Sequence, residues 1–115
     1  MKESVLRDKS YLFAVRVVKL AQYLQSERQE FVLYKQIMRS GTAIGAMVRE
    51  AEFAQSKADF VSKMNIALKE ANEAQYWLLL LHDTGYLEPK LFQSLESDCR
   101  EPIALLVSTV RTSQK

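Results

Sequence analysis

The sequence predicts an all-α fold, an antiparallel up-down-up-down four-helix bundle in a single domain that spans residues 1–115. Three observations lead to this prediction. Only 3 glycines and 2 prolines interrupt the chain, so it has few places to turn. Apolar residues recur at helical spacing in four stretches. The polar segments between these stretches are short, and short connections favour antiparallel neighbours.

The first predicted helix covers about residues 4–27. Its apolar side chains recur at steps of seven, four, three and four, which places them on one stripe. The members of this stripe are Leu6, Phe13, Val17, Leu20 and Leu24. The polar run SERQE, residues 26–30, then ends the pattern.

The second predicted helix covers about residues 31–55 and contains Gly41 and Gly45. Each glycine costs a helix about 1 kcal/mol relative to alanine. Both lie at one edge of an apolar face made by Leu33, Ile37, Ile44, Val48 and Ala51. We expect the glycines to allow a neighbouring backbone to approach closely. A ligand site is the alternative, although no phosphate-binding pattern lies nearby.

The third predicted helix has the strongest periodic pattern in the chain. It begins at SKAD, where Ser56 caps the helix and Asp59 completes a capping box. Steps of four and three then form a continuous seam, which consists of Phe60, Met64, Ala67, Ala71, Ala74, Leu78 and Leu81. The segment HDTGYL ends the helix, with Gly85 as a left-handed C-terminal cap.

The fourth predicted helix starts near Glu88 and Pro89, because proline is tolerated in a first turn. Its apolar face consists of Phe92, Leu95, Cys99, Ile103, Leu106 and Val110. Pro102 lies inside this helix and cannot donate a hydrogen bond to residue 98. We therefore expect a bend between residues 98 and 102, at a cost of about 3 kcal/mol.

Residue types limit the chemistry that one chain can perform. His82 is the single histidine and Cys99 the single cysteine, so neither a metal cluster nor a Cys–His pair can form. The chain also lacks a glycine-rich phosphate loop and the Glu-x-x-His motifs of a di-iron bundle. Because Cys99 lies on an apolar stripe, we expect it to be a buried thiol. The sequence therefore predicts a protein that is not an enzyme and holds no cofactor or metal.

The charge is nearly balanced but unevenly distributed. The net charge is +2, yet residues 1–57 carry 10 basic and 6 acidic side chains, a net +4. The N-terminus has no apolar signal core, and the longest apolar run, residues 76–81, is too short to span a bilayer. Together with the single cysteine, this predicts a soluble cytoplasmic protein with no membrane association.

Five basic residues are candidates for nucleic-acid binding. Three of them, Lys35, Arg39 and Arg49, face away from the apolar side of the second helix, and Arg16 and Lys19 are their possible neighbours on the first. One interpretation is a solvated face. The other is a patch that contacts phosphates, which repetition in a ring of subunits would strengthen.

The run YWLLLL, residues 76–81, predicts self-association. Six consecutive apolar residues cover all sides of a helix, so some must point away from the core. We expect Tyr76 and Leu80 to point outward and Leu79 to lie on the flank. Outward apolar clusters usually mark interfaces. Phe53 is a further candidate for a subunit contact, or alternatively for stacking on bases.

The segment RSGTAIGAMVREAEFAQSKADFVSKMNIALKEANEAQYWLLLLHDTGYL, residues 39–87, resembles the bacterial four helix bundle protein family. This family includes proteins encoded in intervening sequences of large-subunit ribosomal RNA genes, and it is similar to the accessory variability determinant (Avd) proteins of diversity-generating retroelements. The matching positions are Arg39, Ser40, Ile44, Glu50, Asp59, Phe60, Lys69, Glu70, Glu73, Tyr76, Trp77 and Leu78. The chain departs from the usual pattern at Ala43, Met47 and Leu79, where relatives often have polar residues.

The resemblance implies an antiparallel four-helix bundle that assembles as a homopentamer. It implies no established activity for the intervening-sequence branch, whereas Avd proteins use a basic surface to bind nucleic acid and a reverse transcriptase. We therefore expect a non-enzymatic oligomer that binds RNA or DNA, or that is accessory to a nucleic-acid enzyme such as a reverse transcriptase. The alternative is a homo-oligomeric scaffold that binds protein partners only.

Overall fold

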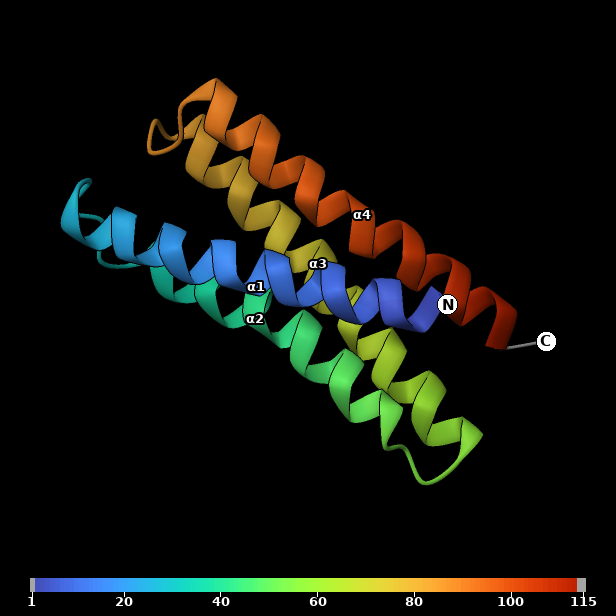
Figure 1. Ribbon diagram of the computed structural model, residues 1–115. Coiled ribbons are helices and arrows are strands. Elements are labelled where there is room, and N and C mark those ends of the chain that lie inside the picture. Colours follow the sequence, from blue (N-terminus) through green and yellow to red (C-terminus); the bar gives the residue numbers. More distant parts are fainter. Residues whose placement is uncertain (1, 114–115) are drawn as a thin grey trace.

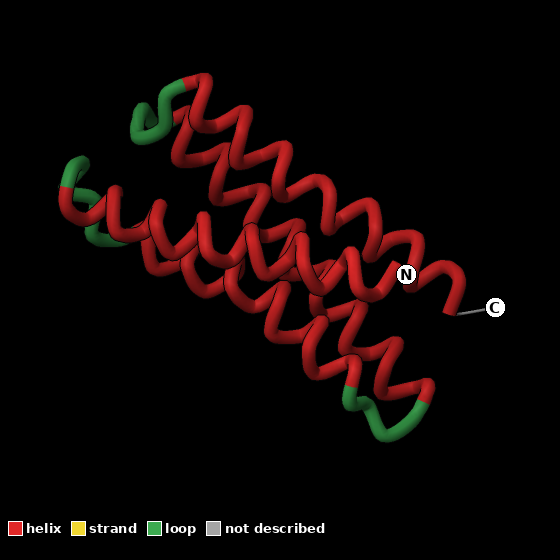
Figure 2. Tube along the Cα trace, viewed as in Figure 1, coloured by secondary structure: helices red, strands yellow, loops and turns green. Residues whose placement is uncertain are grey.

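A computed structural model describes residues 2–113, and these residues form helices and loops without strands (Figure 1). The helices, in chain order, are α1 (Lys2–Ser26), α2 (Leu33–Glu52), α3 (Lys57–Asp83) and α4 (Pro89–Ser113). Figure 2 shows that a short loop joins each helix to the next, so consecutive helices run in opposite directions. The predicted all-α, antiparallel four-helix bundle is confirmed.

Each helix packs against two neighbours, and the helices that lie diagonally across the bundle make no backbone contact. The packed pairs are α1–α2, α2–α3, α3–α4 and α1–α4. The α1–α2 and α3–α4 loops meet at one end of the bundle, where Arg28 donates hydrogen bonds to the carbonyl oxygens of Gly85 and Tyr86 at 2.9 Å. The molecule is elongated, with principal extents of 44 × 21 × 19 Å. None of the four helices is long and apolar enough to cross a membrane.

The apolar stripes predicted from the sequence form the core. The five predicted residues of α1 are buried, and so are the alanines and leucines of the α3 seam. Four predicted core residues at the ends or edges of the stripes are only half-buried, namely Leu33, Phe60, Phe92 and Ile103. Periodicity therefore located the buried face of every helix, but it overestimated how far the core extends.

The two glycines of α2 lie where this helix meets α1. A Cβ atom at Gly41 would lie 2.7 Å from Cγ2 of Val17, which is too close for two carbons. A Cβ atom at Gly45 would lie 3.4 Å from the backbone oxygen of Ser10. The expectation that the glycines allow close approach of a neighbouring backbone is therefore met at Gly45 but not at Gly41. At Gly41 the neighbour is a side chain, and at Gly45 it is backbone.

The ends of α3 carry the caps that the sequence predicts. Ser56 Oγ accepts a hydrogen bond from the backbone N–H of Asp59 at 3.1 Å. The Asp59 carboxylate accepts from the backbone N–H of Gln55, one residue earlier than a standard capping box requires. At the other end Gly85 has a φ of 89°, and the N–H groups of Gly85 and Tyr86 donate to carbonyls of the last turn of α3.

The start of α2 differs from the prediction because Glu30 caps it. Glu30 is 5% exposed, and its carboxylate accepts hydrogen bonds from the N–H groups of Val32, Leu33 and Tyr34 at 3.0, 2.7 and 2.7 Å. Gln29, with a φ of 54°, turns the chain so that the carboxylate reaches these donors. α2 therefore begins at Leu33 rather than at residue 31, and it ends at Glu52 rather than at residue 55.

Pro102 does not interrupt α4. The helix is continuous from Pro89 to Ser113, and the Pro102 ring is buried in it. Figure 1 shows no sharp change of direction along α4. The helix thus accommodates the proline without the pronounced bend that we expected between residues 98 and 102.

Candidate nucleic-acid interface

The five basic residues predicted to contact phosphates lie on α1 and α2. They are Arg16, Lys19, Lys35, Arg39 and Arg49. Four of them are exposed, and Arg16 is half-buried. They do not form one uniform patch, because neighbouring helices supply carboxylate partners to two of them.

Arg39 belongs to a polar network between α2 and α3. Its Nη1 donates to Oε2 of Glu70 at 2.9 Å, and its Nη2 donates to Glu73. Trp77 Nε1 donates to Oε2 of Glu73 at 2.9 Å. This indole hydrogen bond, and then the bond from Arg39, lowers the pKa of Glu73, while the Glu73 carboxylate raises the pKa of Arg39. Two carboxylates thus balance the charge that we expected to face phosphates.

Arg16 is held in a similar way between α1 and α4. Its Nη1 donates to Oδ2 of Asp98 at 2.8 Å and to Oγ of Ser94 at 2.9 Å. The side chain therefore bridges the two helices. Both Arg16 and Arg39 act first as links between helices.

The other three candidates carry charge that is not balanced locally. Lys19, Lys35 and Arg49 form no ion pair with any residue in the range 2–113. Lys35 and Arg49 are separated by about four helical turns, so they share the outer side of α2. Lys19 lies on the exposed side of α1. These three residues are the cations of the predicted patch that remain available to an anionic partner.

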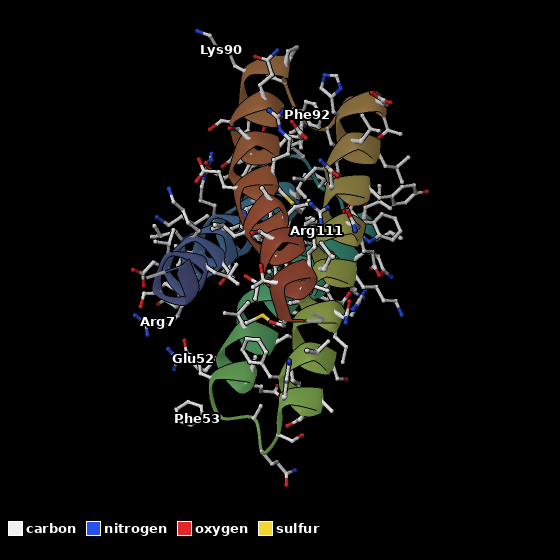
Figure 3. The ribbon with its side chains drawn as sticks, turned by 90° about the vertical axis from the view of Figure 1, so that its right-hand side faces the viewer. Arg7, Glu52, Phe53, Lys90, Phe92 and Arg111 are labelled. Carbon is white, nitrogen blue, oxygen red and sulfur yellow. The ribbon has the colours of Figure 1, made fainter. Side chains whose placement is uncertain are left out.

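A groove runs between α1 and α2 beside Arg49, and we call it the α1–α2 groove. It encloses about 290 Å³. Its residues are Arg7, Tyr11, Ala14, Thr42, Gly45, Ala46 and Arg49. Four of these residues are small, whereas Tyr11, which is 62% exposed, and the two arginines are large. Arg7 lies beside Glu52 (Figure 3), with 3.6 Å between Nη1 and Oε1.

Arg7 and Tyr11 are not among the residues predicted to contact nucleic acid. A signal was present, because Arg7, Tyr11 and Ala14 follow one another at steps of four and three, the spacing of one helical face. On α1, this face lies next to the buried apolar stripe, on the side of the helix that faces α2. Periodicity alone could not show that α2 would place Arg49 opposite it.

The predicted interface residues are exposed to different degrees. Phe53, in the turn after α2, is 81% exposed (Figure 3), and Tyr76 on α3 is 57% exposed. The expected order of Leu79 and Leu80 is wrong, because Leu79 is 49% exposed whereas Leu80 is half-buried. The reason is that α3 packs against both α2 and α4. Fewer of its side chains therefore face solvent than a helical wheel drawn for α3 alone suggests. α1 also exposes large apolar side chains that we did not predict, including Leu12 at 59%.

The remaining reactive groups show no catalytic arrangement. Burial raises the pKa of the Cys99 thiol to about 12, and Sγ lies 3.5 Å from the carbonyl oxygen of Ala71. His82 stacks on Phe92 with ring centroids 4.5 Å apart. Within the part of the chain that the structure describes, no three His, Cys, Asp or Glu side chains are grouped to hold a metal ion.

Comparisons with known proteins agree with this fold. A family model described as 23S rRNA-intervening sequence protein matches residues 2–108. A crystal structure of a protein of unknown function from the S23 ribosomal protein family of Bacteroides thetaiotaomicron VPI-5482 has a TM-score of 0.95 to this structure. The two chains are 54% identical, over 96% of this chain and 99% of that one. No curated protein matches the chain.

Proposed function

The chain belongs to the 23S rRNA-intervening sequence protein family, and from this premise we propose that it is a non-enzymatic, oligomeric four-helix bundle that binds nucleic acid through the outer side of α1 and α2. The observation that carries the proposal is the unbalanced charge of Lys19, Lys35 and Arg49. Cations without carboxylate partners release counterions when they meet phosphates, and this release drives binding that is indifferent to sequence.

The charge distribution along the chain supports the same side of the molecule. Residues 1–57, which include α1 and α2, carry a net +4, whereas the chain as a whole carries +2. A single copy therefore offers a modest positive surface. Several copies in one assembly would multiply the number of phosphates contacted, and affinity rises steeply with that number.

The test is a salt titration of binding to generic RNA and DNA, followed by fluorescence anisotropy. Lys35→Glu/Arg49→Glu should weaken binding, and the log–log salt slope for single strands should fall by about 1.4, because each lost contact contributes about 0.7. The matched control is Lys90→Glu/Arg111→Glu. It changes the charge equally and replaces the same two residue types on one helix, α4 (Figure 3).

The control variant should keep most of the affinity and the salt slope of the unmodified protein. Equal losses in both variants would show that only net charge matters and that α2 has no special role. If the unmodified protein binds neither RNA nor DNA at low ionic strength, then the proposed nucleic-acid-binding function is wrong. The same protein could then be tested for co-purification with a reverse transcriptase of the Avd type, the partner that the resemblance implies.

The second candidate function is that of a homo-oligomeric scaffold for protein partners. The observation that favours it is the exposure of Phe53, Tyr76 and Leu79, three large apolar side chains that water solvates poorly. Self-association is common to both candidates, and we propose a closed homopentamer for each. Nucleic-acid binding in the salt titration is the result that separates them.

A further inference from the structure

We propose that the α1–α2 groove holds one nucleotide unit of a single-stranded nucleic acid, with the base stacked on Tyr11 and a phosphate held by Arg49 and Arg7. This inference rests on the proposed function and assigns it a site. It extends the predicted patch by two residues of α1 that the sequence did not suggest.

The shape of the groove sets the size of the ligand. Ala14, Gly45 and Ala46 are small residues that leave space in its lining, and a Cβ atom at Gly45 would lie 3.4 Å from the Ser10 backbone oxygen. A volume of about 290 Å³ is at the lower limit of ligand pockets, which begin at roughly 300 Å³. The groove is thus of a size for a single nucleotide unit rather than for a longer stretch of nucleic acid.

Tyr11 supplies a free aromatic face. Its side chain is 62% exposed, and it forms no hydrogen bond or ring contact with any residue that the structure describes. Val15 and Val18 continue the apolar surface beside it on α1. Bases stack on exposed aromatic rings of this kind without regard to their identity, and a base must be unpaired to present its face.

The two arginines supply the charge. Arg49 has no ion-pair partner among residues 2–113, and Arg7 lies 3.6 Å from both Asp8 and Glu52. This distance exceeds the 2.7–3.2 Å of a normal N–H···O hydrogen bond, so a phosphate can replace these weak contacts without breaking a strong one. Guanidinium groups bind phosphates through two parallel hydrogen bonds. Two cations and a free ring together fit a nucleotide better than a peptide carboxylate.

The experiment compares labelled oligothymidine alone with the same strand annealed to oligoadenosine. Tyr11→Ala should weaken binding of the single strand about 5- to 150-fold, the range that corresponds to the loss of one stacked base. Tyr11→Phe should retain it, because the ring remains. Duplex binding should change little in both variants. Arg49→Ala should lower the single-strand salt slope by about 0.7.

Two further variants test whether a loss of binding comes from the groove itself or from the loss of any exposed aromatic ring. Phe31→Ala removes a comparably exposed ring, 59% exposed, from the loop between α1 and α2, outside the proposed contact between copies, and it should leave binding unchanged. Ala46→Leu narrows the groove without a change in charge or aromatic content, and it should weaken single-strand binding as Tyr11→Ala does. Melting temperature and light scattering of each variant show whether the fold and the assembly persist.

The outcomes distinguish this inference from the function on which it rests. If the unmodified protein binds single strands and Tyr11→Ala and Ala46→Leu bind them equally well, the groove is not the site and the proposed function stands. An equal loss in Phe31→Ala would also overturn the groove assignment. If the unmodified protein binds neither strand at low ionic strength, both proposals fail together.

Discussion

At the scale of single residues, the contact between Gly41 and Val17 limits how α1 and α2 can pack. Gly41→Ala would place a Cβ atom 2.7 Å from Cγ2 of Val17, so the valine or the helix must move. Overpacking of this kind costs about 1–3 kcal/mol, and the better helix propensity of alanine offsets about 1 kcal/mol. We expect a lower free energy of unfolding in urea, by up to about 2 kcal/mol.

The neighbouring glycine provides the control for this prediction. Gly45→Ala meets only the Ser10 oxygen at 3.4 Å, so it should be close to neutral. Val17→Ala removes the obstacle to a Cβ atom at position 41. The double variant Val17→Ala/Gly41→Ala should therefore be more stable than the sum of the two single effects. Strictly additive effects would show that the two positions do not interact.

Glu73 should make stability depend on pH. Its pKa lies below the ordinary value of 4.5, chiefly because Trp77 donates to its carboxylate and then because Arg39 does. The carboxylate form is thus favoured in the folded protein. The resulting stabilisation is fully present above pH 4.5 and disappears as the pH falls through the lower folded-state pKa.

Glu73→Gln should accordingly flatten the pH dependence of the urea midpoint below pH 4.5 and lower the midpoint at neutral pH. Glu50→Gln is the matched control, because Glu50 is exposed and forms no ion pair with the residues of the described range. It should leave the profile unchanged. Identical profiles for the two variants would mean that the network with Arg39 contributes no stability.

At the scale of helices, periodicity predicted which face of each helix is buried. It could not predict which residues of the other helices contact the remaining faces. The α3 seam was read correctly because steps of four and three return to one side of any α-helix. The partners of Arg39 lie 31 and 34 residues further along the chain, so only the packed structure shows that its charge is balanced. For the same reason the spacing of Arg7, Tyr11 and Ala14 could indicate one face of α1, but not the α1–α2 groove, which two helices build together.

Helix ends were less predictable than helix faces. Glu30 was read as part of a polar break, but its carboxylate binds three consecutive N–H groups and determines where α2 starts. This role depends on the left-handed conformation of Gln29, which is uncommon for a residue other than glycine. In contrast, Ser56 and Gly85 were predicted correctly because their residue types are strongly preferred at those caps.

Pro102 provides a prediction about α4 as an element. Pro102→Ala restores a donor for the carbonyl of residue 98 and removes a steric clash, worth about 3 kcal/mol. The buried ring loses apolar contact, about 0.8 kcal/mol for each methylene, and the unfolded chain becomes more flexible. We expect a net stabilisation of about 1 kcal/mol in thermal unfolding. Destabilisation would show that the helix depends on the proline for its packing.

At the scale of the whole molecule, the bundle leaves apolar side chains on two separate outer sides. α3 exposes Tyr76 and Leu79, and α1 exposes Tyr11 and Leu12. If the α1 side binds nucleic acid beside Arg49, then the α3 side remains for contact between copies. This division gives each outer side one role, and it makes the two roles separable by substitution.

The last prediction tests that division. We expect light scattering to give a mass close to five times the 13.2 kDa of one chain. Leu79→Glu introduces a charge into the proposed contact between copies, where it would be desolvated, so the assembly should dissociate. Leu12→Glu is the matched control, because it makes the same change at an exposed leucine of α1, 59% exposed against 49% for Leu79, and it should assemble normally. A monomer of the unmodified protein at micromolar concentration would refute the assembly. Dissociation by Leu12→Glu alone would instead place the contact on α1, and the α1–α2 groove could then not be open in the assembly.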